Sequence, residues 1–156
     1  MNRRRLLLGG AAAAALATLA PPRAAAREAR APRFTGNPFT LGVASGYPLP
    51  DAITLWTRLA PEPLAPDGGL VAGDIPVRWE IAADPGFRRI VRSGTTYAEA
   101  VFGHSVHLDL LGLEPDREYW YRFHAGAASS AVGRTRTAPA AGTLPDRLRI
   151  AVASCQ

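Results

Sequence analysis

The sequence contains one cysteine, no lysine, and no apolar run long enough to cross a membrane comfortably. With Cys155 as its single cysteine, the 156-residue chain cannot form an internal disulfide framework. All 18 basic residues are arginines. The longest apolar stretch, residues 6–20, has 15 residues with only Thr18 polar, whereas a membrane-spanning helix needs about 20. These features exclude a disulfide-stapled scaffold and argue against a membrane anchor.

Residues 1–26 have the features of a cleaved signal peptide. The basic group Arg3-Arg4-Arg5 precedes the apolar stretch, and Ala24-Ala25-Ala26 after it provides a small-residue cleavage site. The arginine pair resembles a twin-arginine (Tat) signal, although Asn2 and Leu6 replace the usual Ser or Thr and Phe. An ordinary Sec signal with an arginine-rich start is the alternative. We expect a protein exported to the periplasm or outside the cell, with the Tat machinery as a partner and no membrane span after cleavage.

The positive net charge of the chain belongs mainly to this signal segment. The formal charge of the whole sequence is +5, but Arg3, Arg4, Arg5 and Arg23 lie within residues 1–26. The 14 arginines that remain oppose 13 acidic residues, which gives a mature net charge of about +1. No basic stripe is interleaved with aromatic residues, so the sequence gives no sign of a nucleic-acid-binding surface.

Residues 38–138 consist of short segments in which apolar and polar residues alternate. Strands are expected over 39–43, 53–59, 77–81, 90–97, 105–110, 119–123 and 132–137. Turn residues separate them, as in Asp84-Pro85-Gly86, and no segment keeps a helical period. Seven short strands in about 100 residues predict an all-β fold, a fibronectin type III or Ig-like β-sandwich. We place Trp79 in its core. The preceding residues 27–37 are short of apolar side chains and are predicted to be a linker.

A local signature within this region supports the sandwich. The segment Leu113-Glu114-Pro115-Asp116-Arg117-Glu118-Tyr119 places a proline-containing turn before a strand that opens on tyrosine. This spacing predicts a tyrosine corner, in which the phenol bonds back to upstream backbone. Tyr119 is therefore interpreted as a structural residue and not a catalytic one.

The last residues of the sequence predict the start of a second domain. After a linker at 139–146, residues 148–156 have the pattern of a buried strand that runs into a loop. A lone strand cannot bury its faces or pair its backbone, so its partners are expected beyond Gln156. We therefore interpret residues 147–156 as the beginning of a larger, truncated domain, and the chain as a fragment.

Few residues of the sequence are candidates for chemistry. Three residues apart on one strand, His104 and His107 would point to opposite faces and could not chelate one ion together. Surface or edge positions are expected for them and for His124. Four aspartates stand beside Pro or Gly, where they serve turns: Asp51, Asp67, Asp74 and Asp84.

Cys155 is the candidate metal ligand. It follows a predicted buried strand at the point where the chain leaves the sheet, and such strand ends often carry ligand sites. A thiolate at this position would suit a transition metal. An inert buried cysteine is the alternative from position alone.

Several blocks of the sequence resemble the opening of the alkaline phosphatase D family, the PhoD-like phosphatases. In chain order they are Phe39–Gly46, Leu55–Pro61, Val77–Ala82, Gly112–Phe123, Gly133–Pro139 and Ala151–Gln156. Together they cover essentially the whole chain past Asn37. One departure is Tyr47, which stands where the family usually has Asp.

The resemblance implies an exported metallophosphoesterase that cleaves phosphate monoesters and diesters with an iron and calcium centre. It implies that the sandwich precedes a layered α/β catalytic domain, of which residues 147–156 are the first strand. It also implies that Cys155 is an iron ligand, that the remaining ligands lie past Gln156, and that the fragment alone is inactive. The alternative is a stand-alone secreted fibronectin-type module for binding or adhesion, because fold does not fix function.

Overall fold

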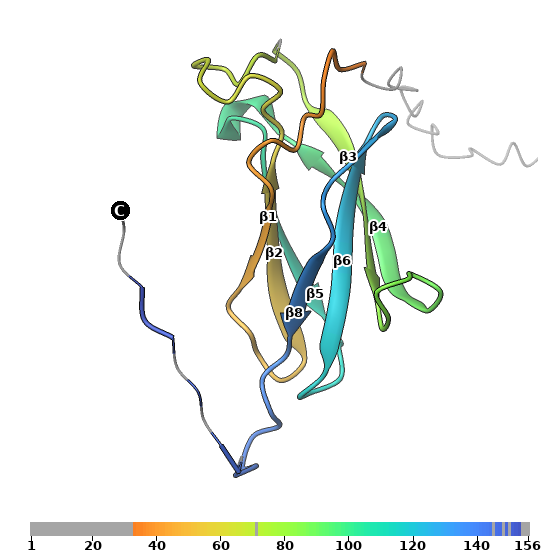
Figure 1. Ribbon diagram of the computed structural model, residues 1–156, viewed down its shortest axis with the longest axis vertical. Helices are drawn as coiled ribbons and strands as arrows, with labels where there is room; N and C mark the ends of the chain where they lie inside the picture. The colour runs from red at the N-terminus through yellow and green to blue at the C-terminus, as the bar shows by residue number, and fades with distance from the viewer. Residues whose placement is uncertain (1–32, 71, 145, 148, 150, 154–156) are drawn as a thin grey trace, which may run out of the picture.

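The computed structural model describes residues 33–70, 72–144, 146–147, 149 and 151–153. The predicted signal peptide and Cys155 lie outside these residues. The described elements are eight strands and a short 3₁₀ helix (Figure 1): β1 (Val43–Gly46), β2 (Ala52–Arg58), β3 (Ile75–Ala82), β4 (Ile90–Ala98), η1 (Ala100–Phe102), β5 (Ser105–Leu111), β6 (Glu118–Ala125), β7 (Ala128–Ser129) and β8 (Gly133–Arg136). Within the described residues, no helix is both long and apolar enough to span a bilayer.

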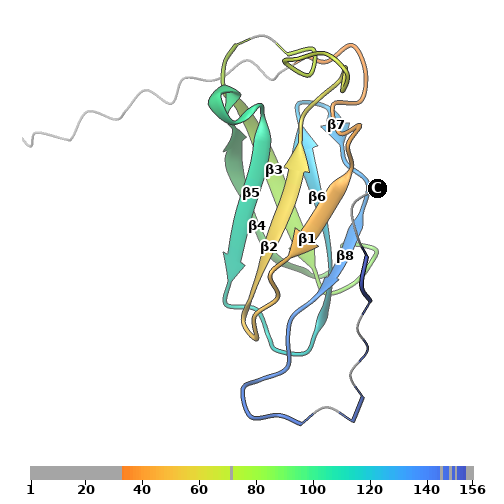
Figure 2. The same ribbon diagram turned by 90° about the vertical axis from the view of Figure 1, so that its left-hand side faces the viewer.

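The strands form two antiparallel sheets packed face to face, as Figures 1 and 2 show. One sheet has the order β1-β2-β5. The other has the order β4-β3-β6, and both β7 and β8 pair with β6. The predicted β-sandwich of fibronectin type is therefore confirmed.

The core lies between the sheets and is built by strict alternation along the strands. On β2, Ile53, Leu55 and Thr57 are buried while the residues between them are partly exposed. The same pattern on β6 buries three aromatic residues and an alanine: Tyr119, Tyr121, Phe123 and Ala125. The rings of Tyr121 and Phe123 meet edge to face, with 6.2 Å between their centroids, an arrangement that aromatic pairs favour. The alternating strands predicted at 53–59 and 119–123 are confirmed as β2 and β6.

Trp79 is only partly buried, which corrects its expected core position. Its side chain faces inward and packs against the core cluster. However, it pairs with Gly94 on β4, the edge strand of its sheet. The indole lies over Gly94, so that a Cβ atom built there would come within 2.7 Å of Cζ2. Because Gly94 has no side chain and β4 is an edge strand, the Trp79 indole remains partly exposed to solvent.

Two other boundaries differ from the sequence expectations. The strand predicted at 39–43 begins at Val43, because Gly42 N–H donates to the Phe39 carbonyl in a turn and Gly42 has a φ of 74°. Phe34, placed in the linker by sequence, packs against the core, so the packed domain begins before Pro38. Among the described residues of the predicted final strand, Arg149 and residues 151–153 are exposed and extended outside any sheet.

Candidate functional site

The histidines occupy three different environments and do not form a common site. His104 precedes β5 and is 3% exposed, which corrects its expected surface position. Its Nε2 lies 3.0 Å from the carbonyl oxygen of Gly73, so the ring donates there and ties two loops together. His107 is exposed on the outer side of β5. His104 therefore lies in the core before β5, whereas His107 lies on the exposed face of that strand.

Of the four aspartates predicted to serve turns, three accept hydrogen bonds from backbone N–H groups: Asp67, Asp74 and Asp84. Asp84 accepts hydrogen bonds from three backbone N–H groups, those of Gly86, Arg88 and Arg89. These bonds lower the pKa of Asp84, that from Arg89 most strongly. Asp67 accepts from Gly69 N–H at 2.8 Å. Asp74 accepts from Ala100 N–H at 3.1 Å, and so connects the start of β3 to η1.

A charged cluster on the outer face of β3 and β6 was not expected from the sequence. Because Glu80 and Arg122 are paired across these strands, Arg122 donates to Glu80 Oε2 from Nε at 2.9 Å and from Nη2 at 2.8 Å. The Arg122 guanidinium also lies 4.0 Å from the ring centroid of Phe87. His124 Nε2 lies 3.6 Å from the same Glu80 oxygen, and His124 Nδ1 lies 2.8 Å from Ser129 Oγ.

The pKa shifts in this cluster favour an ionised Glu80 and a neutral His124. The Arg122 hydrogen bond lowers the pKa of Glu80, and burial opposes it. Burial lowers the pKa of His124, Arg78 adds to the effect, and Glu80 opposes it. The His124 Nε2 atom is buried without a hydrogen-bond partner among the described residues. Glu80, paired with Arg122, and the neutral His124 are therefore interpreted as structural residues. Neither of them lines the cavities found among the described residues.

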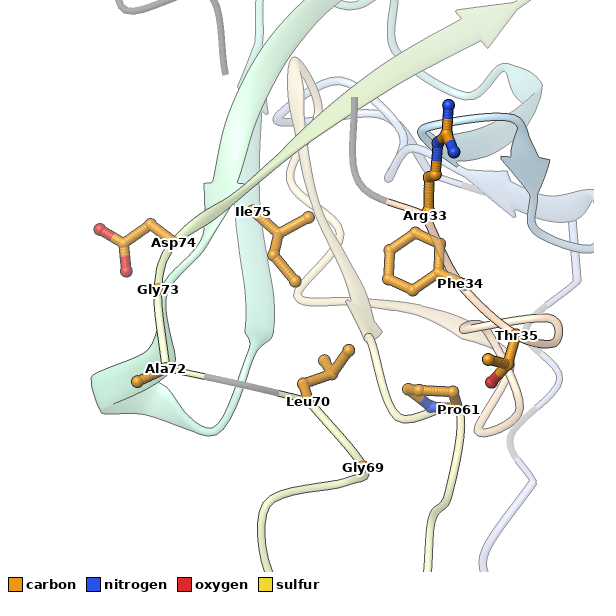
Figure 3. A pocket seen from close by; sticks show the side chains of 10 residues that line it. All are labelled: Arg33, Phe34, Thr35, Pro61, Gly69, Leu70, Ala72, Gly73, Asp74 and Ile75. Carbon is orange, nitrogen blue, oxygen red and sulfur yellow. The ribbon is translucent and has the colours of Figure 1, made fainter. Parts of the chain in front are cut away.

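A cavity of about 380 Å³ opens at the end of the sandwich where the β2–β3 connection folds over (Figure 3). The Phe34 ring and the side chains of Leu70, Pro61 and Ile75 surround it, and the Asp74 carboxylate points away from it. Its described lining therefore brings no two titratable side chains together. Such a cavity can take an apolar group but has no acid–base pair for catalysis.

The described residues do not fit a metal centre. Among them, no three His, Cys, Asp or Glu side chains come close enough to hold an ion. Iron or zinc sites in proteins usually need three or more such ligands. Cys155, the predicted ligand, lies outside the described residues.

The charged cluster was missed because its signal is spread over two strands. Arg78 and Glu80 alternate with apolar residues on β3, and Arg122 and His124 do so on β6. This alternation shows that all four point outward. Which of them meet depends on the register between the two strands, and alternation alone does not determine it.

Comparison with known proteins relates the chain to one family. The family described as PhoD-like phosphatase, N-terminal domain, matches residues 23–139. Alkaline phosphatase D of Bacillus subtilis (strain 168) is 50% identical over 139 residues, which are 89% of this chain and 24% of that protein. The chain thus spans about a quarter of the length of this curated relative.

One solved structure agrees with this relationship. A structure of PhoD aligns with a TM-score of 0.71 and 54% identity over 72% of this chain and 22% of that one. A human fibronectin type III domain also aligns, with a TM-score of 0.46 and 13% identity over 74% of this chain and 84% of that domain. The family match covers most of the chain, and the sequence identity to alkaline phosphatase D extends across it. The chain therefore belongs to the PhoD-like phosphatase family, of which it carries the N-terminal domain.

Proposed function

We propose that this chain is the N-terminal part of a longer, exported phosphoric ester hydrolase and that it has no hydrolytic activity by itself. The observation that supports this most directly is the 50% identity to alkaline phosphatase D, confined to 24% of that protein's length. The matched part is the N-terminal domain of the family. The substrate class is then a phosphate monoester or diester. The stand-alone binding module is not favoured by these matches.

The sandwich serves, in this proposal, as a folded platform that precedes the catalytic domain. Several of its titratable side chains are engaged in turns and ion pairs, as at Asp84 and Glu80. Iron and calcium would supply the Lewis acid and the activated nucleophile for displacement at phosphorus. Their ligands would come from residues past Gln156 together with Cys155, which we propose as an iron ligand. Residues 1–26 would direct export and then be cleaved from the exported protein.

Two measurements test this function. Reading the gene past codon 156 should reveal a continuing frame rich in Asp, His and Asn, whereas an in-frame stop would favour the binding module. Purified residues 27–156 should hydrolyse neither p-nitrophenyl phosphate nor bis-p-nitrophenyl phosphate above a metal-buffer blank. The Bacillus subtilis enzyme serves as the positive control. Turnover by the purified fragment would contradict the proposal.

A further inference from the structure

The outer face of the β1-β2-β5 sheet is centred on a tryptophan with small neighbours. Trp56 points outward from β2, because Leu55 and Thr57 beside it are fully buried. Its cross-strand partners are Ala44 on β1 and His107 on β5. We call this surface the Trp56 face and define it by the outward residues of the three strands: Ala44, Gly46, Thr54, Trp56, Arg58, Ser105, His107, Asp109 and Leu111.

Side chains leave the Trp56 face open. Ala44 and Gly46 cannot cover the indole from β1, and Leu111, at the end of β5, is 65% exposed. The two charged side chains of this face form hydrogen bonds within the domain: Asp109 Oδ1 accepts from Thr54 Oγ1 at 2.6 Å, and Arg58 Nε donates to the Gly103 carbonyl oxygen at 2.9 Å. None of the ion pairs found among the described residues lies on it. Aromatic side chains with few charges around them are typical of the centre of protein interfaces.

The opposite outer face of the sandwich has the character of a solvated surface. It also carries an outward tryptophan, Trp120 on β6, but its partner on β8 is Arg134. Arg122 two residues along β6 is paired with Glu80, and Arg136 on β8 is paired with Asp116 at 2.8 Å. Charges that are already matched within the domain need no partner protein. The Trp56 face therefore has the character of a surface covered by another domain, and the opposite face has that of a surface exposed to solvent.

The path of the chain indicates what covers the Trp56 face. After β8, the described residues turn below the sandwich and run back on the side of the β1-β2-β5 sheet, as Figures 1 and 2 show. The curated relative is about four times as long as the part matched here, and the matched part is N-terminal. A domain joined to this run would begin on the side of the Trp56 face.

We infer that the Trp56 face is the surface on which the following catalytic domain of the same polypeptide packs. This inference rests on the proposed function. The complementary surface would be apolar at its centre, to cover the indole and the small β1 residues. It would offer hydrogen-bonding groups at its rim, to meet Thr54 and His107.

Hydroxyl-radical footprinting of the longer protein and of the 156-residue chain tests the inference. Trp56 and Trp120 are matched probes, because both are half-buried tryptophans on opposite outer faces. The oxidation rate of Trp56 should fall by roughly five-fold or more in the longer protein, while that of Trp120 stays within about two-fold. Equal Trp56 rates in the two proteins would overturn the inference and leave the proposed function intact.

A pair of arginine substitutions provides the matched control. In the longer protein, Ala44→Arg should restore Trp56 oxidation toward the rate in the short chain, because it places a long cation in the interface. Ser93→Arg, at an exposed outward position of β4, should change nothing. Protection of Trp56 in the short chain together with a dimeric mass would identify a second copy as the occupant and refute the inference. A gene that stops at codon 156 would overturn the proposed function together with it.

Discussion

The phenol oxygen of Tyr119 accepts a hydrogen bond from the backbone N–H of Glu114, with 2.9 Å between Oη and N. Pro115 lies in the turn between them, and Tyr119 is 2% exposed at the start of the inward row of β6. Burial raises the pKa of the Tyr119 phenol, so it stays protonated. This is the tyrosine corner that the sequence spacing predicts. It joins the β5–β6 connection to the sheet that β6 enters.

Tyr119→Phe should lower the free energy of unfolding by about 1–3 kcal/mol, because the Glu114 N–H loses its partner in a partly buried site. Urea denaturation of residues 27–156 measures the effect. Tyr97→Phe is the matched control, since Tyr97 is 57% exposed. An unchanged midpoint for Tyr119→Phe would show that the corner contributes nothing to stability.

Gly133→Ala should destabilise the sandwich by about 1–3 kcal/mol through overpacking. Gly133 at the start of β8 pairs with Tyr121, and a Cβ atom there would lie 2.2 Å from Tyr121 Cζ. The Tyr121 ring is 2% exposed and belongs to the packed core. Gly46→Ala is the control on β1, because a Cβ there meets nothing within 4 Å. Equal thermal midpoints for the two variants would contradict the packing argument.

The fold was predictable from sequence where the determining pattern is local. Alternation along β2 and β6 defines their inward faces, and the tyrosine corner spans only residues 114–119. Burial of His104 was not predictable, because its partner Gly73 is 31 residues away in the chain. The Glu80–Arg122 pair likewise depends on the register of strands 42 residues apart. Such contacts follow from tertiary packing, which a single sequence does not specify.

The unfolding free energy should fall as the pH drops below 6.5 because of His124. Its pKa in the folded protein lies below the unfolded value of 6.5, mainly through burial. The folded state then binds fewer protons than the unfolded state, so stability is retained above pH 6.5 and lost as pH falls toward the folded pKa. Glu80, whose pKa is lowered from 4.5, adds a similar loss at lower pH.

Urea denaturation at pH 7.5, 6.5, 5.5 and 5 checks this dependence. His124→Gln should flatten the curve between pH 6.5 and 5. The loss at lower pH that comes from Glu80 should remain. His107→Gln, which removes an exposed imidazole from β5, is the control. A His124→Gln curve that parallels the unsubstituted protein would refute the role of this residue.

Replacement of both Arg3 and Arg4 by lysine should abolish export of a folded reporter fused after residue 26. Tat signals require the arginine pair and carry folded cargo, whereas an ordinary Sec signal keeps its basic character with lysine. Fluorescence in the periplasmic and cytoplasmic fractions measures the outcome. The single change Arg23→Lys, outside the pair, is the control. Undiminished export of the double variant would favour the Sec alternative.

Cys155→Ser in the longer protein should weaken iron binding by at least about ten-fold, since loss of second-shell partners alone often costs that much. A thiolate is a soft, anionic ligand that holds a transition metal more firmly than a hydroxyl does. Its loss should also remove the visible charge-transfer band that a thiolate bound to ferric iron produces. The sandwich should remain folded, because its packed core is built within residues 34–128. Metal analysis and the absorption spectrum measure the change, circular dichroism checks the fold, and Ser154→Ala is the neighbouring control. A Cys155→Ser protein with full iron content, colour and turnover would leave Cys155 as an inert cysteine.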